Sequence, residues 1–376
     1  MTVTLPAEPA AEYRTDRPSQ PIPQVAQALE GRFPGLSFDP CLERAASIYG
    51  RTSRADDLPL AFSEFVLHWA GCPDPFAAVA HVLTDRSDDQ DLLGYLERTL
   101  PTIDATHVGA ARQPAVPPYA WRWTVFLTDR RFEMQPFPTT APTGASAVMA
   151  LRFLDPVSSA TLITTAPDGA IEEHTAGLSD GHMVAVIALA SRPCTQWIEV
   201  VAGTPRGPRV IVLFPVEVGR PLARTWVGRT RQDEGWITDR LVAEDHALAL
   251  VQEDRARFGL TPLIPDRTLA EVARRHSAEM ASTGEIAHVS EVTGSIVNRL
   301  EAAGYRAAFA AENVARSSSI GDAEEGLMRS PGHRAAILSP HATHVGIGIV
   351  RQPRVDTGVV YFITQIVARP EGGPAD

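Results

Sequence analysis

The sequence predicts an α+β protein in which a β-sandwich separates two domains built of helices around small antiparallel sheets. Its 376 residues favour two or three domains. Apolar residues at helical spacing over 268–283 predict an amphipathic helix, and β-rich runs broken by turn signals over 146–218 predict the sandwich. Two matched landmarks in the same order indicate that the helix-and-sheet fold occurs twice.

Composition excludes several function classes. With 44% hydrophobic and 21% charged residues the chain can bury cores, while a formal charge of -11 offers no basic surface for nucleic acid. The chain has no lysine, which removes Schiff-base chemistry, pyridoxal phosphate anchoring and Walker-type phosphate loops. Because no apolar run approaches about 18 residues, we expect no transmembrane segment.

The first segment and the cysteines leave the compartment open. Residues 1–23 mix proline, alanine and charge without periodicity, and we expect a flexible leader. They lack the basic and apolar regions of a signal segment, so either the protein is cytoplasmic or such a segment was removed and Met1 added. Cys41, Cys72 and Cys194 allow at most one internal disulfide, and the pairing of Cys41 with Cys72 stays open.

Residues 24–135 are expected to be the first copy of the repeated fold. The landmark DATHVGAARQP (104–114) matches HATHVGIGIVRQP (341–353), and an apolar strand follows each. An earlier pair, RFPGLSFDPCLERAA (32–46) and RFGLTPLIPDRTLAEVA (257–273), keeps the same order. We interpret the two pairs as an internal duplication.

Residues 136–219 are expected to form an antiparallel, Ig-like β-sandwich. After a Pro/Thr/Gly linker over 136–146, the candidate strands are AVMALRFL, ATLITTA, MVAVIALA, WIEVVAG and RVIVLFPVEV. Turn signals such as Pro167-Asp168-Gly169 separate them. A polar stretch then makes 220–238 a linker to the last domain.

Residues 239–370 are expected to form the last domain, followed by a tail over 371–376. In its amphipathic helix, Thr268 and Glu271 predict a capping box, and Gly284 predicts the end. A shorter helix follows through Ile296 to Ala302, an acidic segment over 322–328 has helical propensity, and Ser330 before Pro331 predicts a further helix start. Two strands, over 345–349 and 359–367, close the chain.

Six motifs follow one another in order in this last domain: IAHVS (286–290), RLEAAGY (299–305), AENVA (311–315), SPGHRAAIL (330–338), THVGIG (343–348) and YFITQ (361–365). Together they resemble the bacterial branch of the CAP superfamily. That superfamily is also called SCP-like, and it includes cysteine-rich secretory, antigen 5 and pathogenesis-related 1 proteins. The resemblance covers roughly residues 240–369 and implies an α-β-α sandwich with a cleft lined by histidines and glutamates.

The resemblance implies a site of His288, Glu312 and His333, with Asn313, Ser330 and Gln365 lining the cleft. A Trp and a Glu three residues later in many eukaryotic relatives are Leu327 and Ser330 here, so one carboxylate is missing. Glu324 and Glu325 lie nearby in sequence, with no basis for placing either in the cleft. The first copy resembles a degenerate CAP-like domain, because its Glu-Asn position reads Ala80-His81 and neither histidine has a counterpart.

Three functions stay open for this site. The imidazoles of His288 and His333, with the Glu312 carboxylate, would bind a divalent cation such as zinc or calcium weakly. Alternatively Glu312, assisted by the histidines, acts as general acid or base of a hydrolase acting on cell-wall glycan or peptide, although glycoside cleavage usually uses two carboxylates. In the third, the histidine cluster is purely structural in an interaction protein.

Other residues have structural interpretations. His276 is expected to be a core histidine, and His344 part of the fold because His107 is its counterpart in the first copy. The resemblance implies a secreted bacterial protein, extracellular, periplasmic or at the cell surface, which presumes a signal segment removed before Met1. We expect it to act as a binding module for a cell-envelope component or small ligand. The sequence does not determine whether it is an enzyme.

Overall fold

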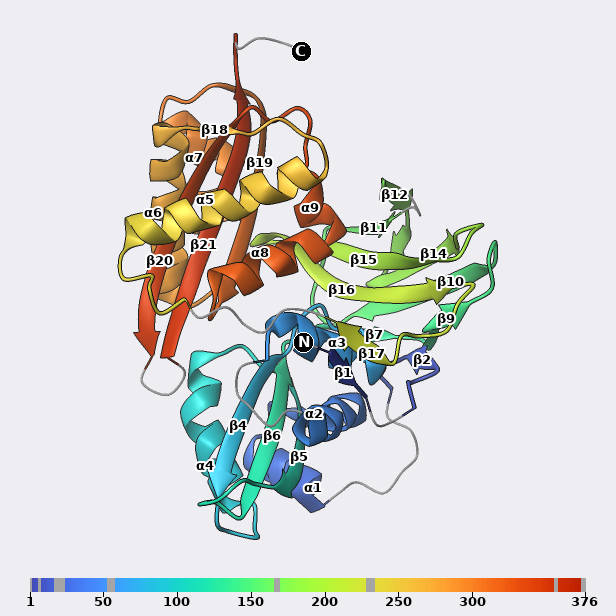
Figure 1. Ribbon diagram of the computed structural model, residues 1–376. Helices are drawn as coiled ribbons and strands as arrows, with labels where there is room; N and C mark the ends of the chain where they lie inside the picture. Colours follow the sequence, from blue (N-terminus) through green and yellow to red (C-terminus); the bar gives the residue numbers. More distant parts are fainter. Residues whose placement is uncertain are drawn as a thin grey trace. The chain divides into compact units, whose positions relative to one another are not determined.

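The computed structural model describes residues 2–5, 8–16, 24–52, 58–165, 170–227, 234–354 and 358–372 (Figure 1). It confirms an α+β protein with several separate sheets. The chain divides into two compact units, one of residues 1–202 and 210–230 and the other of residues 203–209 and 231–376. Among the described helices, none is both long and apolar enough to cross a membrane.

The first unit contains a three-layer domain with helices on both faces of a four-stranded sheet. Its elements are α1 (Gln24–Arg32), β3 (Ser37–Phe38), α2 (Pro40–Thr52), α3 (Leu60–Trp69), β4 (Ala78–Thr84), α4 (Gln90–Thr99), η1 (Leu100–Thr102), β5 (His107–Pro114) and β6 (Trp121–Thr128). The strand order is β3-β5-β6-β4, with β3 parallel to β5 and the other pairs antiparallel. One core joins α2 and α3 to the sheet, and a second joins α1 and α4 to its other face.

The second unit repeats this topology. Its elements are α5 (Arg240–Arg257), β18 (Ile264–Pro265), α6 (Arg267–Thr283), α7 (Ile296–Ala302), β19 (Ala307–Ser317), α8 (Ile320–Arg329), α9 (Pro331–Ile337), β20 (His344–Arg354) and β21 (Gly358–Pro370). The order β18-β20-β21-β19 again has its first two strands parallel and the rest antiparallel. Helices α5, α8 and α9 cover one face of the sheet, and α6 and α7 cover the other.

Close contact between a helix and the middle of the sheet is shared by the two domains. A Cβ added to Gly109 would lie 2.1 Å from backbone atoms of α2, and one added to Gly346 would lie 2.2 Å from backbone atoms of α6. Only glycine allows this approach. Asp39 and Asp266 then accept backbone N–H groups in the first turns of α2 and α6. The same glycine contact and aspartate cap in both domains support the duplication predicted from the sequence.

In sequence, the strands of a β-sandwich stand between these two domains, and all but residues 203–209 of them belong to the first unit. They are β7 (Phe132–Met134), β8 (Phe137–Pro138), β9 (Thr140–Ala141), β10 (Ser146–Phe153), β11 (Ser159–Thr165), β12 (Ile171–Thr175), β13 (Gly177–Ser179), β14 (His182–Ala188), β15 (Cys194–Thr204) and β16 (Gly207–Val218). Sheets of order β13-β14-β10-β7 and β12-β11-β15-β16-β9 enclose one core. All five predicted runs are strands. The domain begins earlier than position 136, because Phe132 and Met134 are in its core.

The prediction of a flexible leader over 1–23 is wrong for its described part. Strand β1 (Thr2–Thr4) pairs with β17 (Thr225–Val227), and β2 (Glu12–Tyr13) pairs with β8. Tyr13 is fully buried, its ring stacking on Phe214 and its hydroxyl donating to the carbonyl of Pro215. Strands this short show no periodicity in sequence. Positions 1, 6–7 and 17–23 lie outside the described residues.

Part of the predicted linker forms a strand. Within 220–238, residues 225–227 form β17, so that part is a paired strand, and residues 228–233 lie outside the described residues. Of the tail, residues 373–376 lie outside them as well.

The helix predictions are confirmed for α6, α7 and α9, but α6 starts earlier than predicted. Asp266, not Thr268, is its N-cap, because the Asp266 carboxylate accepts the N–H of Leu269.

Candidate functional site

The sequence-predicted residues meet at the edge of the last sheet. His288 lies in the loop between α6 and α7, Glu312 lies on the edge strand β19, and His333 lies in the first turn of α9. His288 Nδ1 is 3.0 Å from Glu312 Oε1. The His288 and His333 rings lie with centroids 6.5 Å apart and planes 24° apart. The fold therefore brings His288 beside both other residues.

Glu312 is held as a buried carboxylate. Its side chain is 2% exposed, and its second oxygen, Oε2, accepts a hydrogen bond from Nη2 of Arg299, which is 3% exposed. Burial opposes ionisation, but the hydrogen bond from His288 and the charge of Arg299 outweigh it, so the pKa of Glu312 lies below its usual value. With both oxygens bonded and the charge retained, Glu312 is poorly suited to donate a proton as a general acid.

His333 is held as a neutral ring. Its Nδ1 lies 2.8 Å from the hydroxyl of Ser330, the residue that precedes α9. Burial, together with the neighbouring His288, lowers the pKa of His333 to about 4. The Ser330 side chain makes this contact instead of capping the helix. Among the described residues, neither His288 nor His333 has a hydrogen-bond partner at Nε2.

A second set of polar side chains lies on the other face of the same strand. Asn313 Nδ2 donates to the carbonyl of His333 at 3.1 Å and to Gln365 Oε1 at 3.4 Å. Gln365 Nε2 in turn donates to Oε2 of Glu324 on α8. Asn313 and Gln365, predicted as cleft-lining, are each 3% exposed. Both side chains are therefore buried.

Sequence reasoning missed Arg299 and Glu324 as members of the site. Arg299 lies within the RLEAAGY motif, and its burial beside Glu312 could have been suspected only from the resemblance. Glu324 belongs to a run with the composition of a solvated helix face, yet it is 4% exposed. Its spacing from Ile320 and Leu327 places it on the apolar face of α8, and this helical periodicity is the signal that could have found it.

His276 is a core histidine as predicted, and its Nε2 also lies 3.9 Å from Glu312 Oε1; His344 makes a contact that both domains share. His276 is 1% exposed and its Nε2 donates to the carbonyl of Ala287 at 2.8 Å. His344 Nδ1 lies 2.8 Å from the hydroxyl of Thr343, and the same contact joins His107 and Thr106 at 2.9 Å in the first domain. The matched contacts belong to the repeated fold and not to the site.

The strand register corrects the assignment of the Glu-Asn position in the first domain. Glu312 pairs with Ile366, which lies two residues before the partner of His344. In the first domain the residue two before the partner of His107 is Phe126, and it pairs with Val79. Val79-Ala80, and not Ala80-His81, therefore stands at the Glu-Asn position. The conclusion that this domain lacks the carboxylate is unchanged.

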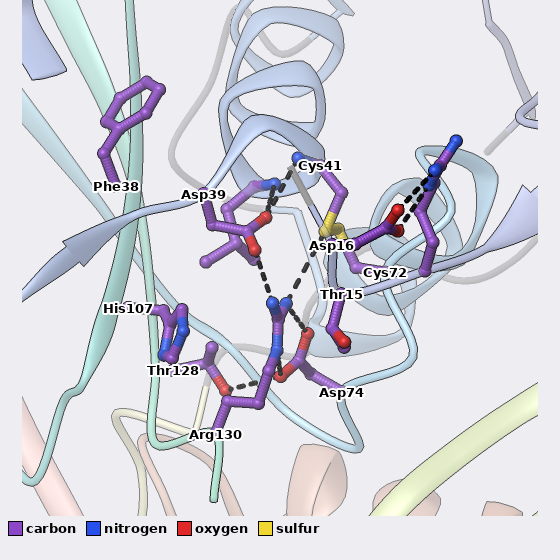
Figure 2. A network of polar contacts seen from close by, with 12 residues as sticks. Thr15, Asp16, Phe38, Asp39, Cys41, Cys72, Asp74, His107, Thr128 and Arg130 are labelled. Atoms are coloured by element: carbon purple, nitrogen blue, oxygen red, sulfur yellow. Dashed lines mark hydrogen bonds and ion pairs between the residues drawn. A yellow bond between two sulfur atoms is a disulfide. The ribbon is translucent and has the colours of Figure 1, made fainter. Parts of the chain in front are cut away.

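A separate polar network in the first domain surrounds a disulfide, and Figure 2 shows it. Cys41 and Cys72 are bonded, with Cα atoms 5.5 Å apart. The buried guanidinium of Arg130 bridges Asp39 and Asp74, and one of its nitrogens lies 3.6 Å from Cys41 Sγ.

The sequence left this disulfide pairing open, and the structure resolves it. The ligand atoms of Asp39, Cys41 and Cys72 lie within 4.8 Å of one another. However, the sulfurs bond each other, and Asp39 is engaged by Arg130 and by N–H groups of α2. We therefore interpret the network as structural and not as a metal site.

Comparison with known proteins supports the interpretation of the second unit. Residues 248–367 match the family model described as CAP, the cysteine-rich secretory protein family. This part of the chain is a CAP domain. An uncharacterized membrane protein, YlbC, of Bacillus subtilis (strain 168) is 37% identical over 121 residues, which are 32% of this chain and 35% of that protein.

A second protein of the same organism, the uncharacterized YkwD, is 32% identical over 115 residues, 30% of this chain and 45% of its own. The chain thus spans less than half the length of either curated relative.

Similar solved structures include an extracellular protein containing an SCP domain from Bacillus anthracis str. Ames, with 20% identity and a TM-score of 0.31 over 50% of this chain and 64% of that one. An outer surface protein from Borrelia burgdorferi has 18% identity and a TM-score of 0.32 over 36% of this chain and 97% of that one.

Proposed function

We propose that the CAP domain binds a divalent cation, zinc in particular, through His288 and His333, and that the protein acts as a binding module outside the cytoplasm. The observation that supports the proposal is the hydrogen bonding of the two histidine rings. Each has Nδ1 engaged by a neighbouring oxygen, of Glu312 or of Ser330, while Nε2 has no partner among the described residues. Metal-binding histidines characteristically have this arrangement.

The two histidine rings fit such an ion in their chemistry. The pKa of His333 lies at about 4, so its ring is neutral at physiological pH, as ligation requires. With metal–nitrogen distances of roughly 2 Å, two imidazoles on one ion have ring centres roughly 5 to 6 Å apart. The observed 6.5 Å is longer than this, so binding would require the two rings to move closer together.

Two nitrogen ligands favour zinc over calcium, which prefers oxygen. Glu312 would orient His288 and not ligate the ion, because its two oxygens already accept from His288 and Arg299. The ligand atoms of His288, Glu312 and His333 are not among the described sets of three that converge within 4.8 Å. Water or a group of the bound partner would complete the coordination, so we expect weak and exchangeable binding.

The disulfide supports a location outside the cytoplasm. Bonds such as Cys41–Cys72 form and persist in oxidising compartments and are rare in reducing ones. A partner in the cell envelope or the medium, a wall polymer or a small ligand, is consistent with that location. The experiments below separate these possibilities.

Isothermal titration of the full chain with Zn²⁺ tests the cation site. We expect one ion per chain, and at least about tenfold weaker binding in His288→Ala and in His333→Ala. His341→Ala is the matched control, because His341 is an exposed histidine of the same domain. If both site variants are folded and bind as the wild type does, the proposal is wrong. If they unfold, the histidines are structural.

Binding to the envelope is tested with purified peptidoglycan, with and without zinc. We expect the wild type to sediment with the polymer, and the double variant at His288 and His333 to remain in solution. Mass spectrometry of the same samples detects new fragments. Fragments absent with Glu312→Gln would show a hydrolase and contradict a pure binding role.

A further inference from the structure

The CAP domain contains a buried acid that the proposed cation site does not use directly. Glu324 lies on α8, is 4% exposed, and its Oε1 has no hydrogen-bond partner among the described residues. Its other oxygen accepts the side-chain N–H of Gln365. Asn313 links Gln365 to the backbone carbonyl of His333, so a continuous chain of contacts joins this acid to the start of α9.

We propose that Glu324, as an uncharged carboxylic acid, positions His333 through Gln365 and Asn313. Gln365 uses its N–H on Glu324 and its carbonyl on Asn313, which fixes the orientation of both amides. Asn313 then holds the carbonyl of His333 and with it the first turn of α9. Glu324 is a positioning residue, because it touches neither ring. This inference rests on the proposed cation site for its functional meaning.

Several observations require the uncharged form. A carboxylate buried with one oxygen unpartnered would bear an uncompensated charge, which is costly away from water. From α5 the facing titratable group is Asp254, which forms an ion pair with Arg257 at 2.9 Å and whose negative charge adds repulsion. From β21 the neutral amide of Gln365 contacts it, and Asn313 of β19 is joined to it only through Gln365. Burial accordingly raises the pKa of Glu324 to about 8.

The arrangement also predicts what happens when Glu324 loses its proton. The ionised carboxylate would strengthen its hydrogen bond to Gln365 but leave a buried charge facing Asp254. Relief of that repulsion requires movement of α8 or of the amides, and His333 is connected to both. The environment of the His333 ring should therefore change as the pH passes through about 8.

The test follows the His333 Cε1–H resonance in the metal-free full chain between pH 6.5 and 9.5, assigned by its loss in His333→Asn. We expect a transition near pH 8 in the wild type and none in Glu324→Gln, which keeps the hydrogen bond without the charge. Glu325→Gln is the matched control, because Glu325 is on the same helix and exposed. A wild type without a transition, or a Glu324→Gln chain that retains it, overturns the inference.

Zinc affinity at pH 7 supplies a second readout. We expect Glu324→Gln to bind within about twofold of the wild type and Glu324→Leu to bind about tenfold more weakly, the usual effect of losing a group that orients a ligand. Equal affinity in a folded Glu324→Leu chain contradicts the inference. If the wild type binds no zinc, the cation proposal fails, and the resonance measurement still decides whether Glu324 acts on His333.

Discussion

The ion pair between Glu312 and Arg299 provides the sharpest test of how the site is built. Both side chains are almost fully buried, at 2% and 3% exposure. Removing one partner of such a pair leaves an uncompensated charge away from water, which costs about 3 to 5 kcal/mol. Glu312→Gln also weakens the hydrogen bond to His288. We therefore expect either Glu312→Gln or Arg299→Leu to destabilise the CAP domain by at least about 3 kcal/mol.

Hydrogen exchange read by mass spectrometry measures this change in the CAP domain alone, separately from the first unit. In peptides of β19 and β21, the loss corresponds to exchange roughly a hundredfold faster or more, since about 1.4 kcal/mol is tenfold. The double variant should lose less than the sum of the single ones, because it leaves no charge unpaired.

The control is Glu253→Gln, which removes an exposed pair with Arg257 on α5. Exposed pairs of this spacing contribute about 0.3 to 0.5 kcal/mol, so its exchange should change little. If Glu312→Gln changes exchange no more than Glu253→Gln does, the buried pair does not support the site and the reasoning is refuted. Strict additivity in the double variant would likewise contradict a direct interaction.

Three further predictions follow from the structure. The pKa of His333 is lowered from 6.5 to about 4, so between these pH values the unfolded chain binds more protons than the folded one. Acidification from pH 6.5 to 4 should therefore lower the free energy of unfolding of the CAP domain by up to about 3 kcal/mol, and by less in His333→Asn. Hydrogen exchange measures this change as well. Replacing Cys41 and Cys72 together with serine should destabilise the first unit by about 3 kcal/mol in urea unfolding, and an unchanged midpoint would contradict a stabilising disulfide. Gly346→Ala should destabilise the CAP domain by about 3 kcal/mol or more, because its Cβ would meet α6 backbone, whereas Gly326→Ala, with nothing within 4 Å, should be neutral or slightly stabilising in thermal unfolding.

The strongest sequence signals were local. Helix α6 and its end at Gly284, the start of α9 at Pro331 and the five runs of the sandwich follow from periodicity and capping, which depend on neighbouring residues. Strands as short as β1 and β2, with three and two residues, show no hydrophobic periodicity. The sequence therefore predicts a leader where these strands form. Asp266 was missed as a cap because two acceptable capping residues stand close together.

The candidate site also shows the difference between what the sequence predicts and what only the tertiary structure decides. The resemblance of the motifs to the CAP superfamily selected His288, Glu312 and His333, and it implies that one carboxylate is missing. Only the tertiary structure decided that Arg299 fixes Glu312 as an ionised carboxylate and that Glu324 is a buried acid. Both depend on contacts between residues distant in the chain, and the protonation of a carboxyl group is set by the water, charges and donors that folding brings around it.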